Sequence, residues 1–529
     1  MRHAKHFLTL SFLLIYLFAR AQFIPNRYFT QDIAHYQFAI SLNDASDEIQ
    51  GEATILVRFR AELDTLTLDL SDKMKVTDIK NDKGVPLKFI HQNDLLSILL
   101  PQKGITGGSI TLKISYRGIP EDGLIIGTNK YGDRTFFGDN WPNRAHKWLP
   151  SNDHPRDKAT VEFIVTAPEH YQVVGNGEKT QEYPNGFGFK TTHWKEKVPL
   201  PTKVMVIGVA KFAVEHSGLI QGIPSSIYVF PQNRTEGFSD YKPSLLVLDW
   251  FSRNIGPFPF SKLAHVQSKT RWGGMENAGA IFYFENSVNG KNERESLIAH
   301  ETAHQWFGNS ASEADWRHVW LSEGFATYCT VLYLEDRYGE ERRTQELLSQ
   351  RKTIISYFEK IKTPIVDLNV KDINTVLSTN TYQKAGWVLH MLRNKTGDEL
   401  FWKGLRTYYA RYKYSNALTE DFQRVMEEVS EISLGEFFKQ WFYQAGHPQL
   451  KYDWKWNESK KELQLSIAQL QDAMFSFPLE VALLDAQKNV IETLTISVSD
   501  KNTTFSRKVK EKPSSIQLDP RTLLLFDIK

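Results

Sequence analysis

The sequence has almost no cysteine and, beyond its N-terminus, no long apolar run, and both absences limit what the protein can be. Cys329 is the only cysteine among 529 residues, which excludes an intramolecular disulfide. We interpret Cys329 as a buried apolar residue rather than a nucleophile, because it falls within a predicted helix. No run after the N-terminus is long enough to span a bilayer. The chain must therefore be stabilised by its core.

Charge of one sign is also lacking. The chain has 64 Lys and Arg against 62 Asp and Glu, a net charge of +2 that becomes −1 without residues 1–21. Such a balance gives no field that favours nucleic acid or an anionic membrane. The composition, with 41% hydrophobic residues, is that of a globular protein, and 529 residues predict two to four domains.

The first 21 residues have the pattern of a secretory signal. Arg2 and Lys5 form a basic start, an apolar stretch covers 7–18, and Ala19-Arg20-Ala21 matches a cleavage site. A membrane anchor is the alternative, but the apolar stretch is short for one. We therefore expect export to the periplasm or the extracellular medium, with Gln22 as the first mature residue.

Hydrophobic patterning divides the remainder into three parts. Alternating runs separated by Gly, Asp, Asn and Pro indicate a large antiparallel β-domain over 22–215. A mixed and then largely helical pattern over 216–448 predicts a second domain, and alternation returns in a small β-domain over 449–529. The expected fold class is therefore α+β and multidomain. Predicted elements include strands at 53–59, 65–70, 109–116, 160–166, 203–214, 226–230 and 263–268, and helices at 241–255, 320–338, 386–395, 399–412 and 419–429.

Residues 300–304 read His-Glu-Thr-Ala-His, and Glu323 follows 19 residues later. If 295–307 is helical, His300 and His304 project from one face. Two imidazoles and one carboxylate, with a fourth position left to water, are typical of a catalytic zinc site. Glu301 is placed to take a proton from that water rather than to bind the metal.

Two further segments have both a structural and a functional interpretation. Gly273-Gly274-Met275-Glu276-Asn277 is either a plain turn or a substrate-lining edge. In the second case Glu276 would bind a cationic group such as a peptide's free α-amine. Tyr382 is either an aromatic packing residue or a phenol that donates a hydrogen bond to a developing oxyanion. The two segments alone do not decide between these readings.

Taken together, the motifs resemble the gluzincin zinc aminopeptidases, the family of aminopeptidase N and the leukotriene-hydrolase aminopeptidases. The resemblance rests on 273–277, 300–309, 320–326 and Tyr382-Gln-Lys, in that order, with further similarity at 144–160 and 446–448. It implies a thermolysin-like catalytic domain and a small C-terminal β-sandwich. The chain ends where many relatives have a helical domain. We therefore expect a form without that domain, whose site is more open or is capped by a second subunit.

The resemblance also implies roles for individual residues. It implies one zinc ion per chain held by His300, His304 and Glu323, with Glu301 as general base and Tyr382 as oxyanion stabiliser. It implies that Glu276 binds the substrate amine and that the neighbouring Gly273, Gly274, Met275 and Asn277 line the substrate. Five residues before Arg144, where the family usually has a Gln or Glu that also reaches the amine, this chain has Asp139.

We therefore predict a zinc-dependent aminopeptidase that removes the N-terminal residue from peptides with a free amine by means of metal-activated water. One alternative is a non-catalytic peptide-binding scaffold of the same fold. Another is a zinc hydrolase with a different main substrate, such as an epoxide or an internal peptide bond. Glu276 argues against internal cleavage, since an amine-binding acid blocks continuation of the chain.

Overall fold

The computed structural model describes residues 25–529, so the predicted signal over 1–21 lies outside the described residues. Contacts group the chain into two compact units. The first holds the residues up to Asp249 together with Phe258–Glu301 and Tyr414–Asn416, and the second holds Trp250–Pro257, Thr302–Lys413 and Ala417–Lys529. The predicted boundaries at 215 and 448 stay predictions. Among residues 25–529, no helix is long and apolar enough to cross a membrane.

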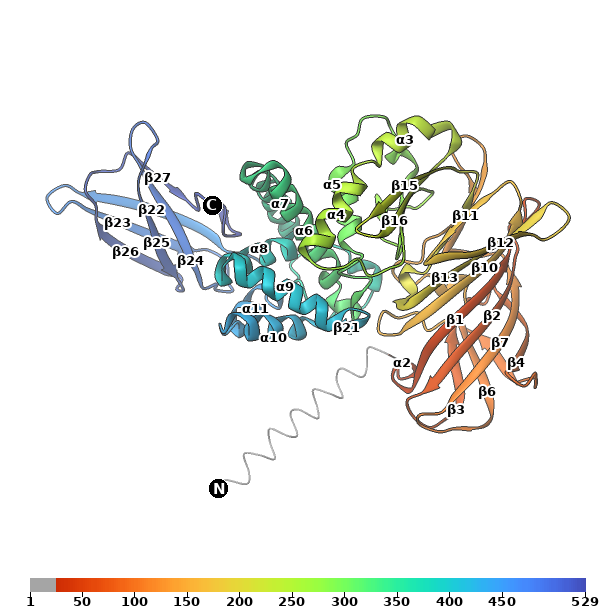
Figure 1. Ribbon diagram of the computed structural model, residues 1–529. Helices are drawn as coiled ribbons and strands as arrows, with labels where there is room; N and C mark the ends of the chain where they lie inside the picture. The colour runs from red at the N-terminus through yellow and green to blue at the C-terminus, as the bar shows by residue number, and fades with distance from the viewer. Residues whose placement is uncertain (1–24) are drawn as a thin grey trace, which may run out of the picture. The chain divides into compact units, whose positions relative to one another are not determined.

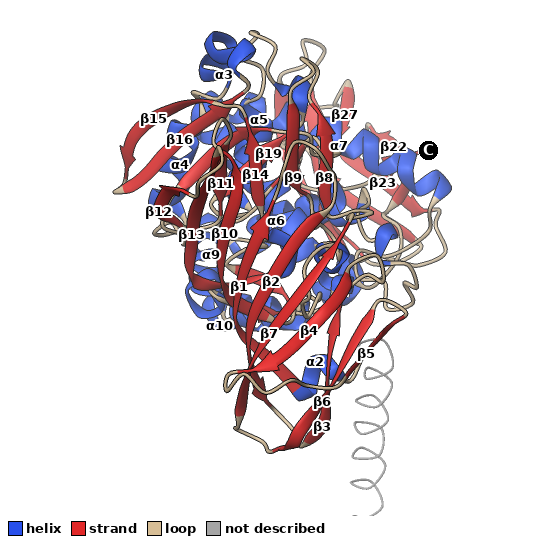
Figure 2. Cartoon of the chain, turned by 90° about the vertical axis from the view of Figure 1, so that its right-hand side faces the viewer, coloured by secondary structure: helices blue, strands red, loops and turns tan. Residues whose placement is uncertain are grey.

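The first unit is dominated by a seven-stranded sheet of order β12-β13-β10-β1-β2-β7-β4 (Figure 2). β1 and β10 pair in parallel, and the other neighbours pair antiparallel. Alternate residues of β1, among them Phe38 and Ile40, are buried, as the period of two requires. The bounds are β1 Gln31–Ser41, β2 Ile49–Phe59, β4 Lys75–Asn81, β7 Ser109–Gly118, β10 Lys158–Pro168, β12 Glu178–Pro184 and β13 Phe189–Pro201.

Three smaller sheets complete this unit. Their orders are β3-β6-β5, β11-β14-β9-β8 and β15-β16-β17-β19-β18. The last of these carries the Gly-Gly segment on its two-residue edge strand β18. Bounds are β3 Leu63–Asp69, β5 Phe89–Gln92, β6 Leu95–Gly104, β8 Leu124–Thr128, β9 Arg134–Gly138, β11 Gln172–Gly175, β14 Ile207–Ala210, β15 Ala213–Ile220, β16 Ile223–Val229, β17 Leu263–Gln267, β18 Gly274–Met275 and β19 Ala280–Tyr283. The helices are α2 Arg27–Thr30 and α3 Arg234–Asp240, and both α4 Ser244–Asn254 and α5 Glu295–Ala303 cross into the second unit.

The second unit begins with helices (Figure 1). They are α6 Trp320–Tyr338, α7 Glu340–Lys360, a π-helical turn at Asn380–Lys384, α8 Ala385–Thr396, α9 Asp398–Tyr412, α10 Thr419–Ser430 and α11 Gly435–Phe442. The short strand β20 covers Ala311–Glu313, and β21 covers Ser415–Ala417, of which the first two residues belong to the first unit. α6 has its predicted bounds because Gly339, at φ +86°, ends it with a backbone conformation that favours glycine.

Two sheets lie at the C-terminal end of the second unit (Figure 1, blue). Their orders are β26-β23-β22-β28 and β25-β24-β27. Alternate residues such as Leu465 on β23 and Val481 on β24 are fully buried, which builds a core between two sheets. Bounds are β22 Gln449–Asn457, β23 Glu462–Gln469, β24 Phe477–Leu484, β25 Val490–Val498, β26 Asn502–Lys508, β27 Ser515–Leu518 and β28 Asp527–Ile528. The predicted fold class, a β-rich domain followed by a helical region and C-terminal strands, is confirmed.

One predicted strand is wrong. The run expected over 203–214 is interrupted, because Thr202–Val204 form a 3-10 turn and β14 and β15 are separate strands in different sheets. Asn176 explains the interruption, since its side chain donates to the carbonyl of Val204 at 2.9 Å and accepts from the amide of Val206 at 2.6 Å. These side-chain hydrogen bonds take the place of a sheet ladder at this point.

Candidate metal centre and active site

His300 and Glu301 lie in the last turn of α5, which ends at Ala303 rather than at the predicted Phe307. His304 starts the turn that follows, where the amide of Asn309 donates to its carbonyl at 3.0 Å. Residues 304–310 form turns, and Gly308 among them adopts φ +118°, a conformation that favours glycine. The four-residue spacing still brings both imidazoles to one site.

His300, His304 and Glu323 form a group whose ligand atoms all lie within 4.8 Å of one another. Glu323 is in the first turn of α6, and its Oε2 lies 3.2 Å from Nε2 of His304. Both side chains are almost fully buried. Two imidazole nitrogens and one carboxylate are the donor set that zinc takes in catalytic sites. The residues present therefore fit a zinc ion.

The other ring nitrogen of His304 is held in place from behind. Nδ1 lies 3.0 Å from Oγ of Ser322 and 3.3 Å from the carbonyl of Phe307. Such partners fix the orientation of a metal-binding imidazole and leave Nε2 to face the ion. A Cβ on Gly308 would lie 2.1 Å from Oγ of Ser322, so only glycine leaves room for this contact. Neither Ser322 nor Gly308 has a role predicted from the sequence, although they lie within the motif segments 320–326 and 300–309.

The Glu301 carboxylate lies against the backbone of β18. A Cβ on Gly274 would be 2.3 Å from Oε1 and 2.4 Å from Cδ of Glu301, whereas one on Gly273 would meet only Leu297, at 3.9 Å. The two glycines therefore differ: Gly274 allows the predicted general base to pack against the strand, and Gly273 does not need to be glycine on steric grounds. Their predicted contact with substrate stays a prediction.

Glu276 lies in the same site. Glu276, Glu301 and His304 each place one ligand atom within 4.8 Å of the others, and Glu276 is buried. Carboxylates gathered in a buried site create a negative field that favours bound cations. Met275 and Asn277, on either side of Glu276, are buried as well. The roles predicted for these three residues remain predictions, consistent with their positions.

Tyr382 lies in the π-helical turn Asn380–Lys384, and its side chain is half-buried. π-Helical turns are frequent at functional sites. The turn is anchored by Asn380, whose Nδ2 donates to the carbonyl of Thr363 at 2.8 Å. It packs on α6 beside Glu323, because a Cβ on Gly324 would be 2.6 Å from that of Ala385 and 3.3 Å from the carbonyl of Thr381. The second unit thus brings the turn that carries Tyr382 next to the helix that carries a metal ligand.

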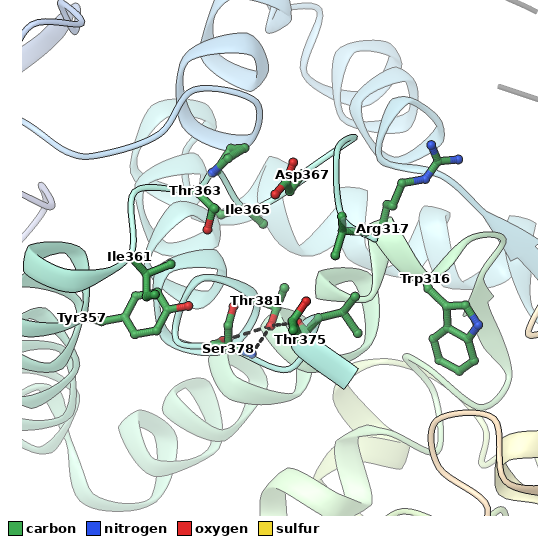
Figure 3. Close-up of a pocket in the computed structure, with 13 residues that line it drawn as sticks. Trp316, Arg317, Tyr357, Ile361, Thr363, Ile365, Asp367, Thr375, Ser378 and Thr381 are labelled. Atoms are coloured by element: carbon green, nitrogen blue, oxygen red, sulfur yellow. Dashed lines mark hydrogen bonds between the residues drawn. The ribbon is translucent and has the colours of Figure 1, made fainter. Parts of the chain in front are cut away.

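A cavity of about 170 Å³ borders this turn (Figure 3). Thr381 and Ser378 lie on one side of it, and Trp316 and Arg317 lie on the side opposite Tyr357 and Ile361. Its lining is mainly apolar, and Arg317 is paired with Asp315 through Nε at 2.8 Å. No sequence motif predicts this cavity, because its walls come from separate segments that only the tertiary fold brings together.

Asp139 is fully buried at the end of β9. Its carboxylate is bonded to Arg144 and to the segment 270–271. The predicted contact between Asp139 and a substrate amine stays a prediction.

The fold and the His-His-Glu group together define a metal site of the gluzincin kind. The Peptidase family M1 domain matches residues 246–441, and the Peptidase M1 N-terminal domain matches residues 33–204. The chain belongs to peptidase family M1, the gluzincin aminopeptidase family.

Two curated relatives are similar over more than half of this chain. A glutamyl aminopeptidase of Bitis rhinoceros is 30% identical over 334 residues, which are 60% of this chain and 35% of that protein. Aminopeptidase M1-B of Oryza sativa subsp. japonica is 29% identical over 318 residues, 58% of this chain and 36% of that protein. The chain thus spans only about a third of the length of these relatives.

Solved structures support the fold. The M1 zinc metallopeptidase from Deinococcus radiodurans has a TM-score of 0.65 at 23% identity, covering 76% of this chain and 90% of that one. A mutant form of it has a TM-score of 0.69 at 23% identity, covering 79% and 96%. At this identity the likeness shows a shared architecture.

Proposed function

We propose that the protein is a zinc aminopeptidase that hydrolyses the bond after the N-terminal residue of peptides. The observation that carries this proposal is the position of Glu276, a buried carboxylate within 4.8 Å of Glu301 and His304 in ligand atoms. An acid at that place can pair with the free α-amine of a substrate and fix the register of the scissile bond. The relatives named as aminopeptidases, and a Deinococcus radiodurans mutant structure with a bound Tyr-Ser-Ala substrate, support it.

His300, His304 and Glu323 would hold the zinc ion. When bound, zinc acidifies water and polarises a scissile carbonyl. Glu301 takes a proton from the attacking water and returns it to the leaving amine. Tyr382 donates a hydrogen bond to the oxyanion that develops on the former carbonyl. Glu276 pairs with the ammonium group of the substrate, so the carboxylates of Glu276 and Glu301 have separate tasks.

The test is hydrolysis of a panel of aminoacyl fluorogenic substrates by the purified protein, with and without a chelator. Each substrate is paired with its N-acetylated form. We expect chelator-sensitive cleavage of the free-amine forms alone. Cleavage of the acetylated forms would contradict amine binding by Glu276 and favour another hydrolase. Bound zinc without any cleavage would favour a non-catalytic scaffold.

We also propose that the protein is exported, on the grounds of the basic start, the apolar stretch and the Ala19-Arg20-Ala21 site in its sequence. N-terminal sequencing of the protein recovered from periplasm and from culture medium tests this. Gln22 as the first residue is the expected result, and an intact Met1 in the cytoplasm would contradict it.

A further inference from the structure

Asp139 is a fully buried carboxylate whose two oxygens are both engaged. Oδ1 accepts from Nη2 of Arg144 at 2.5 Å. Oδ2 accepts from Oγ1 of Thr270 at 3.1 Å and from the amide of Arg271 at 3.3 Å. A buried carboxylate is stable only when it is paired and hydrogen-bonded in this way. Asp139 is 0% exposed, so a substrate amine could reach it only if the residues packed around it moved.

Thr270 and Arg271 lead directly into the segment that carries the site. Three residues after Arg271 the chain enters β18, which pairs with β19 through Gly274 and Met275 only. One further backbone bond, from the amide of Phe284 to the carbonyl of Gly273, is 3.3 Å long. An edge strand of two residues is weakly held by its own ladder. Its position therefore depends on what fixes the chain before and after it.

The downstream end has anchors of its own. Nδ2 of Asn176 donates to the carbonyl of Ala278 at 2.8 Å, and Nζ of Lys262 donates to the carbonyl of Gly279 at 2.6 Å. At the upstream end, Asp139 bonds to both Thr270 and Arg271. Oγ of Ser268 accepts from the amide of Thr270 at 3.1 Å, and Oδ1 of Asp122 accepts from Nη2 of Arg271 at 2.5 Å. Asp139 is therefore the link between β9 and the start of the segment.

The segment carries two groups of the proposed reaction. Gly274 is in contact with the carboxylate of Glu301, and Glu276 follows two residues later. We propose that Asp139 is a positioning residue, which holds segment 270–277 through Thr270 and Arg271 so that Glu276 and Glu301 keep their places. It does not bind the substrate amine itself. This inference rests on the proposed aminopeptidase function only for its kinetic readout.

Variants of Thr270 distinguish a positioning role of Asp139 from direct binding of the substrate amine, because Thr270 bonds to Asp139 and has no predicted role toward substrate. Thr270→Val removes the hydroxyl that donates to Asp139, Thr270→Ser keeps it, and Asp139→Asn weakens the whole link. Thr135→Val is the matched control: Thr135 is a buried threonine on β9 whose hydroxyl bonds only to the carbonyl of Gly127, at 3.4 Å, among the described residues. The double variant Asp139→Asn/Thr270→Val completes a mutant cycle.

For a free-amine substrate we expect Thr270→Val and Asp139→Asn each to raise KM and to lower kcat/KM by about tenfold or more, since small displacements of positioning groups have effects of that order. Zinc content should be unchanged. Thr270→Ser and Thr135→Val should behave as wild type, and the double variant should be no worse than Asp139→Asn. If kcat/KM is unchanged in Thr270→Val but strongly lowered in Asp139→Asn, the proposal is overturned in favour of direct binding. Additive effects of the two substitutions on kcat/KM in the double variant would overturn it as well.

Hydrogen exchange of the segment gives a readout that does not need turnover. The amides of 273–275 should exchange faster in Thr270→Val than in wild type or Thr135→Val. Trp272 is left out of this comparison because its amide donates directly to Oγ1 of Thr270, at 3.4 Å. A wild-type protein that cleaves nothing would refute the proposed function and leave this measurement to decide the positioning role. Unchanged exchange in Thr270→Val and in Asp139→Asn would refute the positioning role on its own.

Discussion

Glu301 has two requirements at once: its carboxylate must reach a water, and it must pack on the backbone of Gly274. The metal ligands do not share this second constraint, because they are fixed by α5, by α6 and by the contacts of His304. Removing the charge of Glu301 while keeping its shape therefore separates proton transfer from metal binding.

Glu301→Gln should retain zinc and lose turnover. The amide preserves the packing on Gly274 but cannot accept a proton, and general-base catalysis typically contributes about 10²–10⁴-fold. The measurements are zinc per chain by mass spectrometry and kcat on the best free-amine substrate. An active Glu301→Gln protein would falsify the proposed mechanism, and loss of zinc would show that Glu301 supports the metal site instead.

Ser322→Ala should weaken metal binding without unfolding the protein. It removes the oxygen 3.0 Å from Nδ1 of His304, and loss of such a partner typically costs about 10–100-fold in metal affinity. Zinc affinity is measured by competition with a chromophoric chelator. Thr330→Ala is the control, because this residue also loses a hydroxyl on α6, one that bonds to the carbonyl of Ala326 at 2.8 Å. Equal zinc affinity in both variants would contradict the supporting role of Ser322.

At the scale of elements, β18 and the π-helical turn are placed beside groups of the proposed reaction. β18 supplies the surface against Glu301, and the turn at Asn380–Lys384 carries Tyr382 against α6. Both elements are short, and both depend on glycines at which a Cβ would collide with a neighbour.

Gly274→Ala should lower kcat far more than it lowers stability. The new methyl would start 2.3 Å from Oε1 of Glu301, and the carboxylate, as the flexible end of its side chain, would move. A displacement of about 1 Å in a catalytic group can cost on the order of 100-fold in rate. Gly273→Ala is the matched control, since its Cβ would meet only Leu297 at 3.9 Å. Similar kcat values for the two variants would show that Glu301 tolerates the displacement.

The sequence predicted the elements better than the contacts between them. α6 has the predicted bounds because its apolar periodicity and Gly339 are local signals. His300, His304 and Glu323 were predictable because their spacing is a motif. The burial of Asp139 was not, because its partner Thr270 is 131 residues away and sequence spacing carries no trace of that contact. The same holds for Gly274 against Glu301 and for the cavity in Figure 3.

On the scale of the whole molecule, most buried charges are paired, and Lys384 is an exception. It is 1% exposed, and its ammonium makes no hydrogen bond within residues 25–529. Burial without a partner lowers the pKa of Lys384 to about 7. In the unfolded chain the same amine has its ordinary pKa near 10.4. Lys384 therefore makes folding depend on pH.

Because the folded pKa is the lower one, the unfolded chain binds a proton that the folded chain lacks between about pH 7 and pH 10. Stability from this group is complete above the unfolded pKa, decreases as the pH falls from about 10, and is fully lost below about 7. The free energy of unfolding of wild type should therefore rise by about 2 kcal/mol relative to Lys384→Met between pH 7 and pH 9, at about 1.4 kcal/mol per proton and pH unit. Urea unfolding at pH 7, 8 and 9 measures the difference. Lys403→Met, at an exposed lysine of α9, is the control. Its free energy of unfolding should change with pH as that of wild type does. If the free energy of unfolding of Lys384→Met also changed with pH as that of wild type does, the buried amine would have to be paired when it is charged.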